Sequence, residues 1–557
     1  MLNISSYLSD LRNEFKGYNG KTFSKDVMAG LTVAAVALPL ALAFGVSSGA
    51  DAASGLITAI FAGLIIGVLS GASYQISGPT GAMAAILITL STKYGMQGVL
   101  LAGFLSGIIL LIMALLKVGK LVSYIPFPVI TGFTSGIAVI IALGQIDNFF
   151  GTHSVGGSAI AKLFSYGTVG FSPNWWAVGF GLLTILIMVF YPKKFDKYCP
   201  SSLAAIIITV ALNFALNPDS STSHLAEVGA IPRTLITPDS LLFKGIDFSL
   251  IGQLIMPAFS IALLGMIESL LCGAAAGKMK GEKLNATREL IAQGIGNVII
   301  PLFGGIPATA AIARTSVVIK SGGQTRVASV IHSVTLILSM FLLGGIMSRI
   351  PLASLAGVLM VTAFRMNDWK AIKHLFSKKL KYSILQYVLT MLATVLFDLT
   401  TAIVVGVIAA MLIFILKSSN LSVDISDIDD KKLGYTGSGV HSNIKIVYLA
   451  GPLFFGTQDQ LSNKLETIEE LQNLRGIVFS MRGVPHIDDS AIGELENLFN
   501  IFKENGTVVL FCGVHPDVVK TMDRAGFVDK VGRDSFLWDA ITAIEKLDEC
   551  FDIPKIR

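Results

Sequence analysis

Long apolar runs, bounded by Lys, Arg, Gly or Pro, follow one another along the chain from Val27 to Leu416. A helix needs roughly 20 predominantly apolar residues to cross a bilayer. The pattern predicts fourteen helical segments, at residues 27–46, 51–70, 78–91, 97–116, 122–144, 175–191, 201–216, 250–276, 289–303, 308–319, 327–346, 351–365, 382–397 and 400–416. We therefore expect a polytopic α-helical membrane protein.

The basic residues between these segments predict its orientation. Fourteen spans place both termini on one side, and 22 Lys and Arg residues between Arg12 and Lys417 fall on that side. The basic residues on the other side are Lys93, Lys162, Arg233, Lys244 and Arg349. Basic loops face the cytoplasm. The prediction is a multi-pass protein of the cell membrane with both termini cytoplasmic, residues 1–26 forming a cytoplasmic segment and residues 27–417 the membrane domain.

Two of the segments are too short to cross. One opens at Ser77-Gly78-Pro79-Thr80-Gly81 and ends near Leu90, a length of ~20 Å against a hydrocarbon thickness of ~30 Å. The other opens at Gly304-Gly305-Ile306-Pro307-Ala308-Thr309 and ends by Lys320. Pro79 and Pro307 are expected in the first helical turns. A single Gly-Pro pair would indicate only a kink in a full-length helix.

These short segments are the third of the first seven and the third of the second seven, and the topology gives them opposite directions. That arrangement is typical of a transporter built as a 7+7 inverted repeat. Broken helices at this depth are tolerated where they line a cavity. We expect the two helix starts to meet near the bilayer midplane and form a binding site.

Such a site favours an anion. Each helix start offers unpaired backbone N–H groups and about half a positive charge. At ~5 Å and an effective dielectric constant near 20, each start contributes roughly 1.7 kcal/mol of attraction for a monovalent anion. Arg314, seven residues after Pro307 and ~10 Å along the same helix, contributes a similar amount. Its loss should weaken anion binding without necessarily abolishing it; alternatively, Arg314 snorkels to the cytoplasmic interface.

Glu268 is the only acidic residue between Leu250 and Gly281. A carboxylate inside a membrane segment is a functional candidate by default. Three roles are open from the sequence: Glu268 carries a proton, binds sodium, or pairs with Arg314 as a structural lock.

Composition and charge exclude a soluble enzyme. Only 14% of the 557 residues are charged, against roughly 25% in soluble domains, and the mean hydropathy is +0.70. Residues 1–420 hold 28 basic and 15 acidic side chains, whereas residues 421–557 hold 14 and 22. The positive excess belongs to membrane loops and does not indicate nucleic acid binding. The four cysteines lack paired spacing, so neither disulfides, a metal site nor a cofactor is predicted.

The periodicity changes after a linker at 418–442. Short apolar strands at 444–449, 476–480 and 507–511 alternate with helical stretches at 458–473, 490–503, 516–525 and 538–550. The pattern predicts a cytoplasmic α/β domain over residues 443–557.

The membrane segments resemble the SulP family of anion transporters. The resemblance is strongest at Ala37–Gly45, Ile76–Met83, Leu263–Cys272 and Asn285–Thr315. It implies core and gate subdomains, a homodimer, and an anion site between spans 3 and 10 that span 1 closes. The matching site residues are Phe44 in span 1, Thr80 and Gly81 in span 3, Glu268 in span 8, and Thr309, Ala310, Ala311 and Arg314 in span 10.

Two positions depart from the family pattern. Leu40 stands where many members have Gln, which is more like the bicarbonate-transporting branch. Sodium-coupled members of that branch place Asp, and Thr one turn later, in span 8; here Glu268 and Cys272 occupy those positions. This departure counts against sodium coupling, and the coupling ion stays open between Na⁺ and H⁺.

The C-terminal domain resembles the STAS module. Ser490, in Ile487-Asp488-Asp489-Ser490-Ala491, matches the serine that is phosphorylated in anti-sigma-factor antagonists. We favour an unmodified helix N-cap for Ser490. The domain is then an element for dimerisation or for binding a cytoplasmic protein partner.

The leading hypothesis is secondary active transport of a small inorganic anion, bicarbonate or sulfate first, by an elevator-type movement coupled through Glu268. A nucleobase–cation symporter of the same fold, a membrane scaffold or sensor that reports anion occupancy, and an anion channel are the alternatives.

Overall fold

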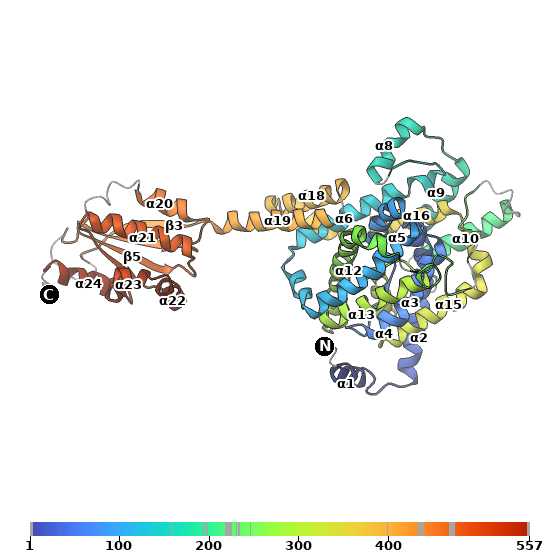
Figure 1. Ribbon diagram of the computed structural model, residues 1–557, viewed down its shortest axis with the longest axis horizontal. Helices are drawn as coiled ribbons and strands as arrows, with labels where there is room; N and C mark the ends of the chain where they lie inside the picture. The colour runs from blue at the N-terminus through green and yellow to red at the C-terminus, as the bar shows by residue number, and fades with distance from the viewer. Residues whose placement is uncertain are drawn as a thin grey trace. The chain divides into compact units, whose positions relative to one another are not determined.

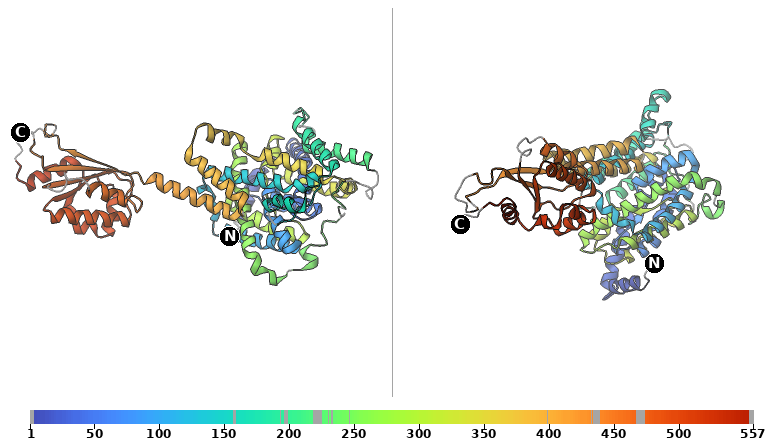
Figure 2. Two further views of the ribbon diagram at one scale, coloured as in Figure 1. Left: turned by 90° about the horizontal axis from the view of Figure 1, so that it is seen from above. Right: turned by 60° about the vertical axis from the view of Figure 1, so that its left-hand side comes forward.

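The computed structural model describes residues 4–553, apart from 157–158, 193, 196–198, 218–224, 230, 232–233, 246, 398, 432, 434–438 and 467–473. Contacts divide the chain into two compact units, Met1–Ile408 and Ala409–Arg557. The first unit is a helical bundle with one short pair of strands, and the second contains a five-stranded β-sheet with helices on both faces (Figures 1 and 2).

Helical residues occupy each of the fourteen predicted segments. The main helices of the first unit are α1 (Ile4–Glu14), α2 (Gly20–Ser47), α3 (Ala52–Phe61), α4 (Gly67–Leu69), α5 (Gly81–Leu115), α6 (Phe127–Gly144), α7 (Ile146–Phe150), α8 (Ala159–Val169), α9 (Trp175–Phe190), α10 (Ser201–Leu216), α11 (Leu241–Lys244), α12 (Ile251–Lys280), α13 (Ala286–Ile299), α14 (Ile312–Lys320), α15 (Val327–Met347), α16 (Leu352–Met366), α17 (Trp369–Ser377) and α18 (Lys381–Leu396), with α19 (Leu399–Ser418) reaching the second unit. Among the described residues, six helices are long and apolar enough to cross a membrane. The crossing of all fourteen segments stays a prediction.

Two predicted segments, 78–91 and 97–116, form one element, α5. Its backbone breaks at Gly95, where φ is 66° and ψ is −174°. Glycine adopts this region without a steric penalty, so the break falls where the sequence permits it. Because of the break, the first half of α5 is a short helix that begins at Gly81.

Close backbone approaches fix the helices around α5. Gly107 lies in α5 where a Cβ would sit 2.6 Å from the amide nitrogen of Val298 in α13. Gly45 of α2 similarly meets the backbone of Asp51 and Gly55. Small residues allow such contacts between membrane helices. As a result α5 packs on α12 and α13, while α15 packs on α2 and α3 (Figure 1).

A second group of helices packs by the same means. Gly357 of α16 meets the Gly181 carbonyl of α9, with 2.9 Å between that oxygen and a Cβ placed at Gly357. Gly136 of α6 meets Thr394 of α18. This second group therefore packs in pairs, α6 with α18 and α9 with α16. The site is built by the helices around α5.

The second unit has one five-stranded sheet in the order β3-β4-β5-β6-β7. β3 pairs with β4 antiparallel, and the other pairs are parallel. The strands are β3 (Ser422–Asp427), β4 (Ile444–Ala450), β5 (Gly476–Gly483), β6 (Val508–Cys512) and β7 (Phe536–Leu537), and the helices are α20 (Gln458–Glu466), α21 (Asp489–Glu504), α22 (Pro516–Arg524), α23 (Phe527–Val531) and α24 (Ala540–Cys550). α20 to α23 cover one face, and α24 covers the other (Figure 2).

Two expectations for this unit are corrected. The predicted linker 418–442 includes β3, which extends the sheet because Ser422–Asp427 pairs along its full length with β4. Ser490 is not the N-cap of its helix. Asp488 is the N-cap, and its carboxylate accepts the Ala491 N–H at 2.9 Å, which leaves Ser490 exposed in the first turn.

A buried histidine ties the segment after β3 to the last helix. His441 Nδ1 lies against Asp430 and Nε2 lies 2.8 Å from Asp548 of α24. Burial alone would lower the pKa of His441, but hydrogen bonds and attraction to Asp430 and Asp548 outweigh it and raise that pKa above 6.5. The same contact, with the Gly439 and Val440 N–H groups, lowers the pKa of Asp430 despite its desolvation.

We predict that this unit loses stability as pH rises. A raised histidine pKa contributes stability that is present below about pH 6.5 and lost as pH rises through the folded-state pKa. Hydrogen exchange of α24 in the full-length protein, corrected for intrinsic rates, should accelerate between about pH 6 and about pH 9. His441→Gln should remove most of that difference. Equal pH dependence in the two proteins would contradict it.

Candidate functional site

Two extended segments cross immediately before the two short helices. Ser77-Gly78 (β1) pairs antiparallel with Thr309-Ala310 (β2), with Ser77 opposite Ala310 and Gly78 opposite Thr309. α5 follows the first segment and α14 follows the second. The antiparallel pairing gives the segments opposite directions and brings the two helix starts together, as the sequence predicts.

Side chains from α12 and α13 hold this crossing. The Asn297 carboxamide accepts the Ala308 N–H at 2.7 Å and donates to the Ala308 carbonyl at 2.9 Å. Ser269 Oγ accepts the Ala310 N–H at 3.2 Å. Since these bonds satisfy the backbone of a segment that belongs to no helix, they explain how extended chain persists inside an apolar bundle.

The helix starts differ from the predicted ones. α14 begins at Ile312, not near Pro307, because Thr309 and Ala310 are in β2 and Ala311 bonds to the Ile76 carbonyl. Pro79 precedes the N-cap Thr80 of α5. Neither proline therefore lies in a first helical turn. α14 has only nine residues, so the expectation of a short helix holds.

Arg314 lies in the first turn of α14, closer to the site than expected. Its side chain is 1% exposed, and Nη2 donates to the carbonyl of Pro79, just before α5. Nη1 has no hydrogen-bond partner, and no carboxylate pairs with this guanidinium in the described part of the chain. Arg314 therefore does not snorkel to an interface. It places an uncompensated positive charge at both helix starts.

Glu268 of α12 contacts the N-cap residue of α5. Its carboxylate accepts a hydrogen bond from the Thr80 hydroxyl at 2.9 Å, and its side chain is half-buried. Since no ion pair joins Glu268 and Arg314 among the described residues, the structural lock is wrong. Proton or sodium binding stays a prediction.

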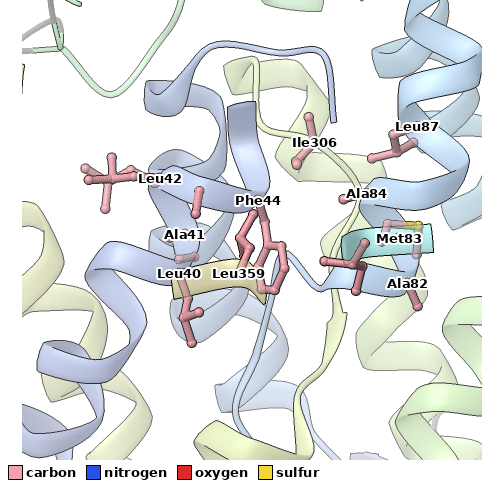
Figure 3. Packing of buried hydrophobic residues seen from close by; sticks show 14 of the residues in the cluster. Leu40, Ala41, Leu42, Phe44, Ala82, Met83, Ala84, Leu87, Ile306 and Leu359 are labelled. Atoms are coloured by element: carbon pink, nitrogen blue, oxygen red, sulfur yellow. The ribbon is translucent and has the colours of Figure 1, made fainter. Parts of the chain in front are cut away.

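Phe44 covers the start of α5. A Cβ on Gly81 would lie 3.1 Å from Phe44 Cε1 and would overlap Ile141 Cδ1. Figure 3 shows the Phe44 ring pointing toward the first turn of α5, where Ala82 and Met83 lie. Gly81 thus allows an aromatic ring and an isoleucine to close directly over the helix start.

Unpaired backbone donors remain at both starts. The N–H groups of Gly81 and Ala82 in α5, and of Ile312 and Ala313 in α14, have no hydrogen-bond partner in the parts of the chain described here. They can bind an anion. Because Arg314 lies in the first turn, its attraction at ~5 Å rises to about 3.3 kcal/mol, equal to both helix starts together. The expectation that the helix starts outweigh Arg314 is therefore wrong.

The two sides of the site differ in access. Ile312 is 52% exposed and Ala311 is half-buried, so the α14 start is open. Along the first half of α5 lies a cavity of about 860 Å³, which reaches Ala84, Lys93 and Ile141. None of the predicted site residues lines that cavity. Ile141 separates it from Gly81.

The structure brings the predicted site residues together. Phe44, Thr80, Gly81, Glu268 and Arg314 all meet at the crossing, and Thr309, Ala310 and Ala311 form the extended segment before α14. Ser490 belongs to the second unit. Among the described residues no group of three His, Cys, Asp or Glu side chains could hold a metal ion.

Several contributors were missed from the sequence. Gly78 leaves room for the Arg314 guanidinium, because a Cβ there would overlap Nη1 and the guanidinium would have to move. Ser269 and Asn297 fix the extended segment. A serine next to Glu268 and an asparagine in a Gly-rich stretch carry no distinctive spacing, so only the three-dimensional contacts show their role.

A profile of the sulfate permease family matches residues 23–390, about two thirds of the chain, and the STAS domain profile matches residues 438–541. The chain belongs to the sulfate permease family. It is therefore a membrane transporter with a C-terminal STAS domain, not an enzyme.

Relatives and solved structures agree with this assignment. The chain is 34% identical over 529 residues to "Putative sulfate transporter YvdB" of Bacillus subtilis, covering 94% of this chain and 97% of the relative. It is 31% identical to "Bicarbonate transporter BicA" of Picosynechococcus, covering 93% and 94%. The transmembrane domain of a cyanobacterial bicarbonate transporter BicA matches with 29% identity and a TM-score of 0.60, covering 71% and 98%.

The whole fold resembles murine Slc26a9, an anion transporter solved in the inward-facing state. The TM-score is 0.85 at 18% identity, covering 99% of this chain and 96% of the other. The sequence prediction of a helical membrane domain followed by a STAS domain is confirmed.

We predict that Gly78→Ala weakens anion binding at least tenfold. The added methyl group must displace the Arg314 guanidinium, because a Cβ at Gly78 would overlap Nη1, and a shift of ~1 Å at a charged site is enough for such a loss. Binding of radiolabelled sulfate and bicarbonate to purified protein measures it.

Gly252→Ala is the matched control for this substitution. Gly252 is in α12 with no heavy atom within 4 Å of an added Cβ. The Gly252→Ala protein should therefore keep the anion affinity of wild type. Wild-type affinity in a folded Gly78→Ala protein would contradict the placement of Arg314.

Proposed function

We propose that the chain is a secondary active transporter of a small inorganic anion, sulfate or bicarbonate, bound at the starts of α5 and α14. The observation that carries this proposal is the Arg314 guanidinium, which is buried beside both helix starts without a carboxylate partner in the described residues. A buried cation needs a compensating charge. The names of the similar sulfate and bicarbonate transporters support these two anions as substrates.

Charge counting links the anion to Glu268. Two helix starts of about +0.5 and Arg314 supply about +2. An ionised Glu268 reduces this to about +1, which suits a monovalent anion. A divalent anion is balanced when Glu268 is also neutralised, by a proton or by a sodium ion. Sulfate should therefore enter with one cation more than bicarbonate does.

Alternating access is proposed from the unequal sides of the site. The start of α14 is open, whereas Phe44 and Ile141 close the start of α5 toward the 860 Å³ cavity. By the positive-inside rule Lys93 and Lys162, which line that cavity, are external, so the open side faces the cytoplasm. An elevator-type movement of the helices around α5 against those around α6 would exchange the two sides.

The remaining features of the proposal are fourteen spans in a 7+7 inverted repeat, both termini in the cytoplasm and a location in the cell membrane, which follow the sequence pattern. A homodimer is what the family resemblance implies. The likeness of the fold to Slc26a9 supports the arrangement of the membrane domain.

Purified protein in liposomes tests the function. We expect saturable uptake of labelled sulfate or bicarbonate, faster when a proton or sodium gradient points inward. Uptake of labelled uracil with no response to either anion would instead support a nucleobase–cation symporter. Binding of anions with no flux would support a sensor, and flux that does not saturate would support a channel.

We predict that Glu268→Gln abolishes the gradient dependence of sulfate uptake while sulfate binding stays measurable. The amide is permanently neutral and can still accept the hydrogen bond from Thr80. Uptake with and without imposed proton and sodium gradients measures the effect. Glu282→Gln, at a half-exposed acid after α12, is the control and should leave the coupling intact. Unchanged gradient-driven uptake in Glu268→Gln would remove Glu268 from the mechanism.

A further inference from the structure

His332, in α15, has an unusual environment. Its side chain is fully buried, and neither ring nitrogen has a hydrogen-bond partner among the described residues. The neighbouring Ser333 hydroxyl and Arg314 Nη1 have the same deficit. Each such atom costs about 1–3 kcal/mol if it stays unpaired, and buried polar groups nearly always have partners. Since Gly63 packs against both His332 and Ser333, and Arg314 interacts electrostatically with His332, these unpaired atoms can share one partner.

These atoms lie along one face of the second apolar segment. Ala59 of α3 packs beside Gly78, where Arg314 Nη1 lies. Gly63 is one helical turn further along. A Cβ at Gly63 would lie 3.0 Å from His332 Nδ1 and would overlap the Ser333 hydroxyl. The absence of side chains larger than methyl at both positions lets the polar atoms of α14 and α15 approach this face.

The helix is irregular at this point. Ala62–Ile66 forms a π-helical turn, η1, between α3 and α4. Such turns are rare and occur frequently at functional sites. The irregular turn and the unpaired side chains coincide at Gly63.

The charged groups around His332 indicate which partner suits the unpaired atoms. The apolar parts of α2 from Met28, and all of α3, η1 and α4, contain no titratable residue, and Arg314 is the charged group that interacts electrostatically with His332. An uncharged imidazole has one donor and one acceptor, whereas a guanidinium has donors alone. Water can accept from Arg314, donate to the imidazole and pair with the serine hydroxyl.

We propose that a buried hydration site between α3, α14 and α15 connects Arg314 Nη1 to His332, which makes His332 a positioning residue for the charge behind the anion site. The effect on anion binding rests on the proposed function, whereas the hydration site itself does not.

Two substitutions of His332 test the proposal in the full-length protein. His332→Leu fills a similar volume but removes the acceptor, and we expect it to weaken sulfate or bicarbonate binding about tenfold. His332→Gln keeps a donor and an acceptor and should stay within about threefold of wild type. Ser333→Ala, which removes one peripheral partner, should also stay within about threefold.

A double-mutant cycle separates positioning from a general structural role. In an Arg314→Ala background, His332→Leu should have no further effect, because the charge it positions is gone. Three outcomes would each overturn the proposal. They are equal losses of affinity in His332→Leu and His332→Gln, wild-type affinity in His332→Leu, and the same tenfold loss when His332→Leu is added to Arg314→Ala.

A second measurement does not depend on anion binding. A cryo-EM map that resolves ordered water should show density touching both Arg314 Nη1 and His332 in wild type and none there in His332→Leu. If wild type bound neither anion, the proposed function would fail while this map still decided the hydration site. A wild-type map with no water density between Arg314 Nη1 and His332 would overturn the proposed hydration site.

Discussion

A positive charge buried among apolar helices, with no carboxylate beside it in the described chain, is the constraint on which the site depends. Arg314 is among the largest fully buried side chains, yet it bonds to a carbonyl instead of an acid. Removing a cation from water costs several kcal/mol unless something compensates it. One carbonyl compensates it only in part. A bound anion would complete the compensation, so the same charge that is unfavourable in the empty site becomes the source of affinity.

The surrounding fold is arranged to hold that charge at two helix starts. Gly78 leaves room for the guanidinium, and the crossing of β1 and β2 places Pro79 within its reach. Asn297 and Ser269 satisfy the backbone of the crossing. Glycine contacts between α2 and α3 and between α5 and α13 bring these elements close enough for such bonds. Each of these features is local, but together they keep irregular backbone inside an apolar bundle.

The sequence predicted the elements better than the contacts. Apolar periodicity located a helix in every predicted segment, and the two Gly-Pro sequences correctly marked the short helices. It could not show that β2 delays the start of α14 to Ile312, because two residues of extended chain have no distinctive pattern and depend on partners in α12 and α13. That delay moved Arg314 into the first turn and made its attraction for an anion equal to that of both helix starts together.

The same limit applies elsewhere. Ser490 was expected to cap a helix that Asp488, two residues earlier, caps, since Asp and Ser are equally good N-cap candidates from sequence alone. His332 gave no signal in the sequence, because a single histidine in an apolar segment shows neither its burial nor its lack of partners. In each of these cases, contacts between distant segments and not local helix propensity decide the role of the residue.

The central claim is that an anion binds between the starts of α5 and α14. Anomalous scattering from crystals grown with selenate tests it most directly, since selenium marks a sulfate-like ion. The account predicts a selenium peak within hydrogen-bond reach of the free N–H groups of Gly81 and Ile312, on the side of Thr80 and Glu268. A fully occupied peak elsewhere in the membrane unit, with these N–H groups bonded to protein, would contradict it.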